Sequence, residues 1–364
     1  MKFIKLSAVL LCICILLTAC AGNGENNTEE AESVTSAENT SNEITSKENN
    51  STVPTASSEK SDNSSNTVSA IPENKTLTYN RKKVTVTNEY GNVLKNIGNV
   101  GTTVTAYGKL KEDKYKSSLE KLEKVFDNYS HTVSAVAYSL DNSSAVCYNT
   151  STDLFCACTV KAAYTLYCCK QMESGKCTLD TKMKYEKKHY EPGTGDMQYC
   201  PIGTEFDMRT ILDKTMRISD NVGYMMATDY FGREGYNKWI TDLGCPSLKI
   251  SPTVWSLHAK AKDLAVIWKE IYDYFGKNTE YSNFLYNSCT NTPNNYATAA
   301  LNLEYSHKQG NNRSGKWLAY SDAGIVWKDG NPYIIVILTN APGPSDYDAK
   351  MMKDAIKIIN NELF

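Results

Sequence analysis

Apolar side chains recur at helical spacing at both ends of the region from residue 112 to residue 364. From Tyr115 to Tyr129 they return every three or four residues, which predicts an amphipathic helix that starts near Glu112. The stretch 346–363 places its apolar residues on one helical face in the same way. Each of these helices therefore has one apolar face to bury against a neighbouring element.

Between the two helices, three segments have the composition of strands. Residues 131–140 form one, and residues 323–327 and 333–339 form a pair separated by a Lys-Asp-Gly-Asn turn at 328–331. The region thus begins helix–strand and ends strand–strand–helix, with mostly helical sequence between. This order predicts an α/β protein of the α+β kind, in which terminal helices flank an antiparallel sheet and the middle forms a helical lobe.

Residues 76–111 have a different pattern, in which short β-type runs are broken by glycine. The runs cover 84–87 and 102–105, and Gly91, Gly98 and Gly101 separate them. This pattern is typical of a few short strands with turns, too few to bury a large core alone. Two interpretations stay open: a small β-rich unit packed on the next domain, or a loose wall-binding module.

The first twenty residues are a targeting segment by their pattern. Lys2 and Lys5 precede an apolar run over 6–17, which is shorter than the roughly 20 residues that span a membrane. The run ends in Leu-Thr-Ala-Cys at 17–20, which resembles a bacterial lipobox and implies that Cys20 is lipidated. We therefore expect the protein on the extracytoplasmic face of the cell membrane, anchored by lipid. The alternative is an ordinary cleavage site with a cysteine there by chance.

Residues 21–75 are dominated by Asn, Ser, Thr and Glu and contain no aromatic side chain. Ten acidic residues against three lysines leave this stretch with a net charge near −7. Such a segment buries too little apolar surface to offset its ordering entropy. It predicts a disordered stalk with a mean reach of about 40 Å.

Overall composition narrows the partners and cofactors. The whole chain has 39 basic and 41 acidic residues and no basic stripe, which argues against nucleic acid as a partner. Its four histidines lack metal-ligand spacing with the cysteines, so we expect no metal and no cofactor. Nine cysteines follow Cys20, and we expect at most one or two disulfides among them. The protein is expected to be a monomer.

Three short motifs fall in order within residues 112–364. They are Cys158-Thr159-Val160-Lys161, Ser219-Asp220-Asn221 and Lys308-Gln309-Gly310. They resemble the S-x-x-K, S-D-N and K-T-G signature of the class A β-lactamase and penicillin-binding protein superfamily, and Gly-Thr-Gly-Asp at 193–196 looks like the family's stretch between the first two motifs. The resemblance implies a β-lactamase/transpeptidase-like fold. It also implies that the substrate is a cell-wall peptide or a β-lactam-like small molecule.

The first motif places a nucleophilic side chain and an amine three residues apart on one helical face. A desolvated lysine beside a second cation has a lowered pKa and can take the proton of the nucleophile. Lys161 would be that base and Lys308 the second cation. The resemblance implies that Ser219 relays protons and that Asn221 contacts a substrate amide. It also implies an oxyanion hole from the backbone N–H of Cys158 and that of Asn311, after Gly310.

The nucleophile position holds Cys158 where the family has serine. A thiol is partly ionised at neutral pH, and a neighbouring ammonium lowers its pKa further, so Cys158 is a competent nucleophile whose product would be a thioester. The alternative is an inert buried thiol in an inactive enzyme.

Gln309 is a second departure, because the family has a hydroxyl there that contacts a substrate carboxylate. Another register puts Arg313, Ser314 and Gly315 in the third motif. We favour Lys308 because a histidine stands before it, as in the usual prefix.

A third departure is the lack of the Glu-x-x-Leu-Asn loop whose glutamate activates the deacylating water in class A β-lactamases. Glu234, Glu270 and Glu280 lack that context and are predicted to be surface charges. Without that base, hydrolysis of an acyl-enzyme is expected to be slow.

Together these features predict a lipid-anchored acyl hydrolase or transferase that acts through Cys158 and Lys161. The main alternative is a catalytically inactive protein of the same fold that binds peptidoglycan peptide or a protein partner. A redox-sensing pair, Cys156 and Cys158, is a third hypothesis, although one intervening residue on a helix makes a direct bridge poor.

Overall fold

The computed structural model describes residues 84–251, 258–290, 292–293 and 301–364. The predicted signal segment with Cys20, the stalk and residues 76–83 lie outside them. The described residues belong to one compact unit of the chain. Among them, no helix combines the length and the apolar character needed to cross a membrane.

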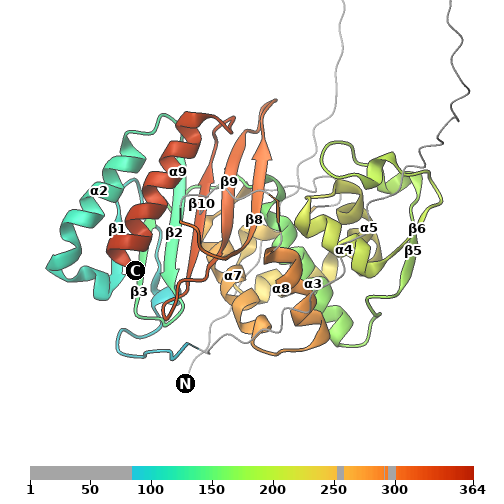
Figure 1. Ribbon diagram of the computed structural model, residues 1–364, viewed down its shortest axis with the longest axis horizontal. Coiled ribbons are helices and arrows are strands. Elements are labelled where there is room, and N and C mark those ends of the chain that lie inside the picture. Colours follow the sequence, from blue (N-terminus) through green and yellow to red (C-terminus); the bar gives the residue numbers. More distant parts are fainter. Residues whose placement is uncertain (1–83, 252–257, 291, 294–300) are drawn as a thin grey trace, which may run out of the picture. The chain divides into compact units, whose positions relative to one another are not determined.

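Six antiparallel strands form the central sheet, in the order β1-β3-β2-β10-β9-β8 (Figure 1). Their bounds are β1 Thr105–Gly108, β2 Val133–Ser139, β3 Ser144–Tyr148, β8 Tyr305–Asn312, β9 Ala319–Val326 and β10 Tyr333–Thr339. At the centre, β2 pairs with β10, with Val136 opposite Val336. The predicted strands at 131–140, 323–327 and 333–339 are confirmed, and β8 forms the edge of the sheet that carries the third motif.

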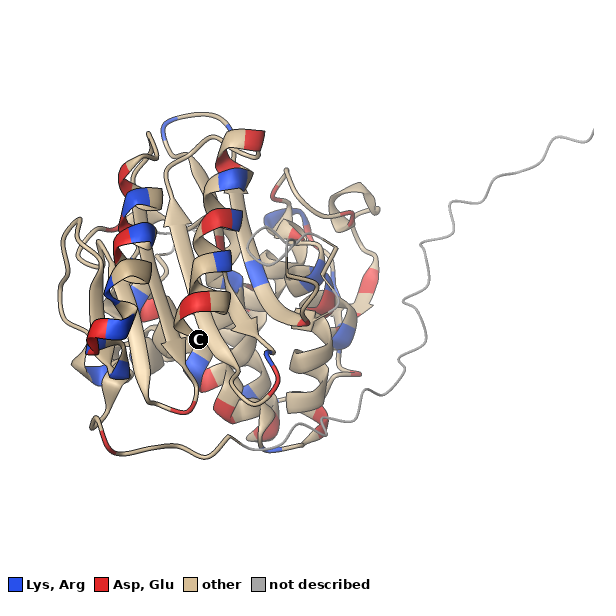
Figure 2. Cartoon of the chain, turned by 60° about the vertical axis from the view of Figure 1, so that its left-hand side comes forward, with Lys and Arg blue, Asp and Glu red and all other residues tan. Residues whose placement is uncertain are grey.

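Two helices cover one face of this sheet, as predicted from their apolar spacing (Figure 1). They are α2, Lys116–Asp127, and α9, Asp346–Ile358, which continues into one π-helical turn, Ile359–Leu363. Ser118 and Lys121 of α2 both bond to the carboxylate of Glu362, at 2.7 and 2.9 Å. On their outer sides acidic and basic residues alternate (Figure 2). The two ends of the region 112–364 are therefore held together.

The other face carries the helical lobe, in which α7 packs on β2, β9 and β10. The helices are α3 Val160–Glu173, α4 Met208–Arg217, α5 Asn221–Phe231, α6 Glu234–Asp242, α7 Ala261–Phe275 and α8 Glu280–Thr290. Two small sheets add to them: β4 Leu154–Phe155 with β7 His258–Ala259, and β5 Lys182–Lys184 with β6 Glu205–Asp207. Eleven of the 14 residues of α3 are buried, so this helix forms the centre of the lobe.

Residues 84–111 differ from the sequence prediction of separate short strands. Residues 84–88 form no strand, a single short helix α1 covers Val93–Asn96, and β1 pairs with β3 of the main sheet. Thr87 and Val100 bond through their backbone N–H groups to Asp141 and Thr150. The described part of this segment therefore belongs to the same fold: β1 adds an edge strand to the sheet, and the residues before it pack on the sheet through backbone hydrogen bonds.

Candidate active site

Cys158 lies in a tight turn just before the central helix. The turn is a single 3-10 turn, Ala157–Thr159, that leads directly into α3. Ala157 has a φ of 45°, in the left-handed region, and the backbone N–H and hydroxyl of Thr159 both bond to the carbonyl of Cys156. A β-carbon at positive φ is sterically disfavoured, so the turn stores strain beside the thiol. Cys158 is 7% exposed.

Lys161, in the first turn of α3, is completely buried. Its ammonium donates to the carbonyls of Ser219 and Asp220, at 2.6 and 3.3 Å, and to Oδ1 of Asn221 at 2.7 Å. An ammonium has three protons and no acceptor, so three acceptors around it favour the charged form. The S-D-N motif therefore binds the Lys161 ammonium through two backbone carbonyls and one side-chain amide oxygen.

The environment of Cys158 favours a thiolate. Burial by itself raises the pKa of the thiol, but the charges of Lys161 and Lys308 act against it, with hydrogen bonds from Lys161 and Thr194. Together they lower the pKa of Cys158 below its ordinary value. Burial also lowers the pKa of Lys161, against the opposite pull of the Cys158 charge. Each group is thus shifted toward the form that the other needs: the sulfur toward the thiolate by the lysine charges, and the amine toward the neutral base by burial.

Lys308 on β8 donates to the hydroxyl of Ser219 and, at 3.3 Å, to the carbonyl of Gln309. Burial, partly offset by the charge of Cys158, brings the pKa of Lys308 down to about 8. Ser219 has a φ of 59°, a strained value that turns the chain before α5. Lys308 is the residue that meets Ser219, whereas Arg313, Ser314 and Gly315 are exposed beyond the end of β8.

Asp220 and Asn221 hold the surrounding loops in place. The carboxylate of Asp220 caps α5 by accepting from the N–H of Gly223 at 2.8 Å and also accepts from that of Met197 at 2.9 Å. The amide of Asn221 donates to the carbonyl of Pro192 at 3.0 Å and accepts from Lys161. A contact between Asn221 and a substrate amide stays a prediction.

Thr194 is a site residue that sequence reasoning missed. Its hydroxyl donates to Oδ1 of Asn221 at 3.3 Å and lowers the pKa of Cys158. Gly193 and Gly195 on either side have φ values of 126° and 97°, and a Cβ on Gly195 would lie 2.1 Å from the carboxylate of Asp220. Glycine is needed for this close approach. The Gly-Thr-Gly pattern was therefore the feature of the sequence that could have identified Thr194 as a site residue.

The edge strand β8 runs directly against the turn that carries the thiol. A Cβ on Gly310 would lie 2.3 Å from the carbonyl oxygen of Cys156 and 3.2 Å from the nitrogen of Cys158. The two predicted oxyanion donors, the N–H groups of Cys158 and Asn311, come from these adjoining segments. Their role stays a prediction.

The structure thus brings five predicted residues together: Cys158, Lys161, Ser219, Asn221 and Lys308. The three glutamates considered as water-activating groups are surface charges. Glu270 pairs with Lys170 and Glu280 with Arg209, and Glu234 is exposed.

All nine cysteines after Cys20 are free thiols in the structure, including Cys156 and Cys158. Within the described part of the chain, no group of three or more His, Cys, Asp or Glu side chains is arranged to hold a metal ion.

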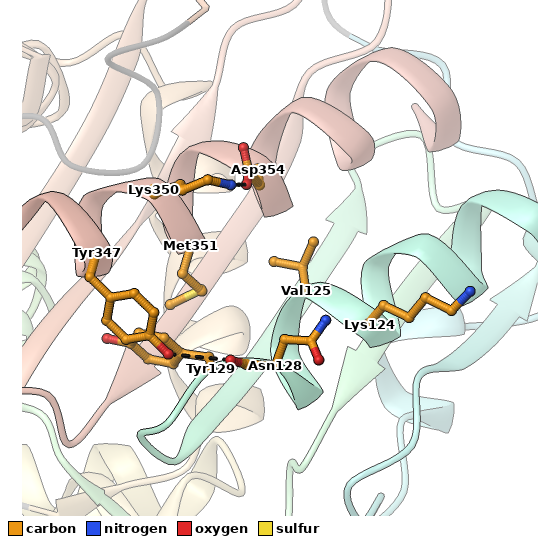
Figure 3. Close-up of a pocket in the computed structure, with 8 residues that line it drawn as sticks. All are labelled: Lys124, Val125, Asn128, Tyr129, Tyr347, Lys350, Met351 and Asp354. Carbon is orange, nitrogen blue, oxygen red and sulfur yellow. Dashed lines mark hydrogen bonds and ion pairs between the residues drawn. The ribbon is translucent and has the colours of Figure 1, made fainter.

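A cavity of about 290 Å³ lies between α2 and α9, on the face of the sheet away from the helical lobe (Figure 3). It is lined by Lys124, Val125, Asn128, Tyr129, Tyr347, Lys350, Met351 and Asp354. The hydroxyl of Tyr347 accepts from the N–H of Ser130 and donates to the carbonyl of Asn128, so the fold itself uses this polar group. The cavity is separate from the thiol and the two lysines.

Residues 118–363 match the model of a family described as "Beta-lactamase enzyme family". Among solved structures, PBP-A aligns with 17% identity and a TM-score of 0.59, over 66% of this chain and 94% of that chain. A β-lactamase from Chitinophaga pinensis aligns with 20% identity and a TM-score of 0.59, over 67% and 98%.

A β-lactamase from Sphaerobacter thermophilus gives 16% identity and a TM-score of 0.57, over 67% of this chain and 95% of that chain. No curated protein matches the sequence. These likenesses confirm the predicted fold class: a mixed helix and antiparallel-sheet fold of the β-lactamase/transpeptidase type.

Proposed function

The chain belongs to the beta-lactamase enzyme family, and we propose that it is an acyl hydrolase or acyltransferase that works through a thioester on Cys158. One observation carries the proposal: a thiol on a strained turn has its pKa lowered by two buried lysines. A lowered pKa raises the fraction of thiolate, which is the nucleophilic form. An inert structural thiol in apolar surroundings has a raised pKa instead, as burial gives Cys147.

Acylation begins when Lys161 takes the proton of Cys158. The thiolate then attacks the carbonyl carbon of an amide, a C–S bond forms, and the electron pair of the C=O bond moves to oxygen. The N–H groups of Cys158 and Asn311 stabilise this oxyanion. When the tetrahedral intermediate collapses, the C–N bond breaks and the departing nitrogen takes a proton from the Ser219 hydroxyl. Lys308 replaces that proton, and a thioester remains.

Deacylation uses the same groups in the reverse direction. Neutral Lys308 takes a proton, through Ser219, from an attacking water or amine. The new bond to the carbonyl carbon forms, the C–S bond breaks, and the thiolate returns. A pKa of about 8 lets Lys308 serve as acid and base near neutral pH.

We propose a cell-wall peptide amide or a β-lactam as the substrate. A mutant of PBP-A, similar in fold, is described as an acyl-enzyme complex with penicillin G. The setting proposed for the chain fits this substrate, since lipidation of Cys20 and a stalk over 21–75 would hold the domain outside the membrane near the wall.

Acyl labelling of the full-length protein tests the proposal. A fluorescent penicillin and an acyl thioester of a wall-type peptide are each incubated with the protein, and the adduct is located by mass spectrometry. We expect at least one of the two reagents to form an adduct on Cys158 in the wild type and in Cys156→Ala, a matched control two residues away, but neither to do so in Cys158→Ala. No adduct from either reagent would refute the covalent mechanism.

A non-catalytic binding protein is the second candidate, favoured by the deep burial of Cys158 and by Gln309 in place of a hydroxyl. It predicts that a peptidoglycan fragment binds equally well to the wild type and to Cys158→Ala, and that no thioester forms.

A further inference from the structure

Gln309 has a buried polar atom that the protein does not satisfy. The residue is 6% exposed, and among the described residues its Oε1 has no hydrogen-bond partner. Oδ1 of Asn311, two residues along β8, is also buried and without a partner there. Unsatisfied buried acceptors are uncommon in folded proteins, because leaving one without a donor lowers stability. Two on one strand indicate a ligand that supplies donors.

Both side chains flank the point where β8 meets the thiol. Side chains alternate along a strand, so Gln309 and Asn311 share one face and Lys308 and Gly310 share the other. Gly310 lies between them, against the backbone of Cys158. Because β8 is the edge strand of the sheet, its outer side has no strand partner in the described part of the chain. A substrate that is held at Cys158 and extends along this outer edge would therefore pass both amides.

A carboxyl group faces Gln309 across the sheet. Its partner across the β8–β9 pair is Asp322, which lies on the same face and is completely buried. Asp322 bonds to Nδ1 of His307 at 2.8 Å, and Nε2 of His307 contacts the hydroxyl of Thr292. A substrate carboxylate placed against Gln309 would bring a second carboxylate near Asp322, and it has no proton to donate to the unpaired oxygens of Gln309 and Asn311.

We infer that Gln309 and Asn311 select acyl donors whose group beside the scissile bond is an uncharged amide rather than a free carboxylate. An amide supplies the N–H that Oε1 lacks and adds no charge next to Asp322. The substrate class is thus an internal peptide bond, as in a wall cross-link, and a β-lactam or a free carboxy-terminal D-alanine fits poorly. The inference rests on the proposed function, whose substrate it makes specific.

Binding of a matched peptide pair to the full-length Cys158→Ala variant tests the selection without turnover. The ligands are an N-acylated Lys-D-Ala-D-Ala with a free carboxylate and the same peptide as its methylamide, measured by titration calorimetry. We expect the methylamide to bind about tenfold more tightly, a difference of about 1.4 kcal/mol. Equal binding, tighter binding of the acid, or no binding of either peptide would overturn the inference.

Second-site variants show which residues are responsible. Gln309→Thr restores the hydroxyl of the family and is expected to abolish the preference for the methylamide, while Gln171→Thr on α3 keeps it. Asp322→Asn removes the negative charge and is expected to strengthen binding of the acid alone. If Gln309→Thr keeps the full preference, Gln309 is not the selecting residue.

The proposed function has a separate readout. Wild-type protein that prefers the methylamide but never forms a thioester on Cys158 would refute the proposed function and keep the inference.

Discussion

Two buried lysines act on one sulfur atom in different ways. Lys161 donates hydrogen bonds to two backbone carbonyls and one side-chain amide oxygen of residues 219–221, while burial lowers its pKa. Lys308 has a hydroxyl and one carbonyl as acceptors, and its pKa is lowered to about 8. The first lysine is therefore suited to take the proton of Cys158 and then stabilise the thiolate, and the second to exchange protons with the leaving and attacking groups through Ser219.

Removal of Lys161 should slow alkylation of Cys158. Without this ammonium, burial raises the pKa of the thiol and the thiolate fraction at pH 7 falls. We expect Lys161→Ala to react with iodoacetamide at least about tenfold more slowly at pH 7, which corresponds to one pKa unit. Lys170→Ala, on the same helix but paired with Glu270, is the control. Identical pH–rate profiles of wild type and Lys161→Ala would contradict the prediction.

Lys308 should also affect stability at high pH. Its pKa is about 8 in the folded protein and about 10.4 in an unfolded chain, so the unfolded state binds more protons between these values. The free energy of unfolding therefore rises with pH over this range.

From pH 8 to pH 10, the wild type is expected to gain up to about 3 kcal/mol relative to Lys308→Met. Urea unfolding at both pH values measures this difference. Parallel changes in the two proteins would show that Lys308 is charged in the folded state.

At the residue level, the sequence predicted the side chains that carry a motif and missed those whose position depends on the backbone. The three-residue spacing of Cys158 and Lys161 predicted their proximity, and the S-D-N motif predicted Ser219 as a site residue. The carbonyls of Ser219 and Asp220 that hold Lys161 are common to all residues and leave no signal. The positive φ of Ala157 is equally invisible, because alanine rarely adopts it.

At the scale of elements, β8 links the sheet to the chemistry. It pairs with β9 along one side and lies against the turn Ala157–Thr159. Its central glycine is required there, because any side chain would meet the carbonyl of Cys156. Movement of β8 would displace Lys308 from Ser219.

Gly310→Ala is therefore expected to impair both stability and acylation. A Cβ at 2.3 Å from a backbone oxygen forces the strand and the turn apart, at a cost of about 1–3 kcal/mol. We expect a fall in Tm of several degrees and a loss of Cys158 labelling. Gly101→Ala is the control, since a Cβ there meets no atom within 4 Å and the φ needs no glycine. A variant with unchanged Tm and labelling would show that the contact is not tight.

The elements that sequence patterns predicted are those with a clear period. A clear period was present in helices α2 and α9 and in strands β2, β9 and β10. The mostly helical sequence between them predicted the lobe. Strand β3 was missed, because five buried residues with serine and cysteine have no alternation. Residues 84–87 looked like a strand but form none, since a strand needs a neighbour to bond to.

For the whole molecule, the proposed attachment to a membrane depends on Cys20, which precedes the described residues. We expect Cys20→Ala to move the protein from the membrane fraction to the soluble fraction and to abolish incorporation of labelled palmitate. Cys14→Ala, within the apolar run, should change neither result. Membrane association of Cys20→Ala equal to that of the wild type would point to an uncleaved signal segment instead.

The pairing of β2 with β10 has a consequence for how the chain is delivered. Val136 and Val336 face each other although 200 positions separate them in the sequence, so the centre of the sheet cannot assemble until nearly the entire polypeptide has been synthesised. Pairings this distant fold slowly. If the chain is exported as its first twenty residues predict, this late pairing would keep the polypeptide open while it passes through a secretion channel, and the sheet would close only after the last helix has crossed.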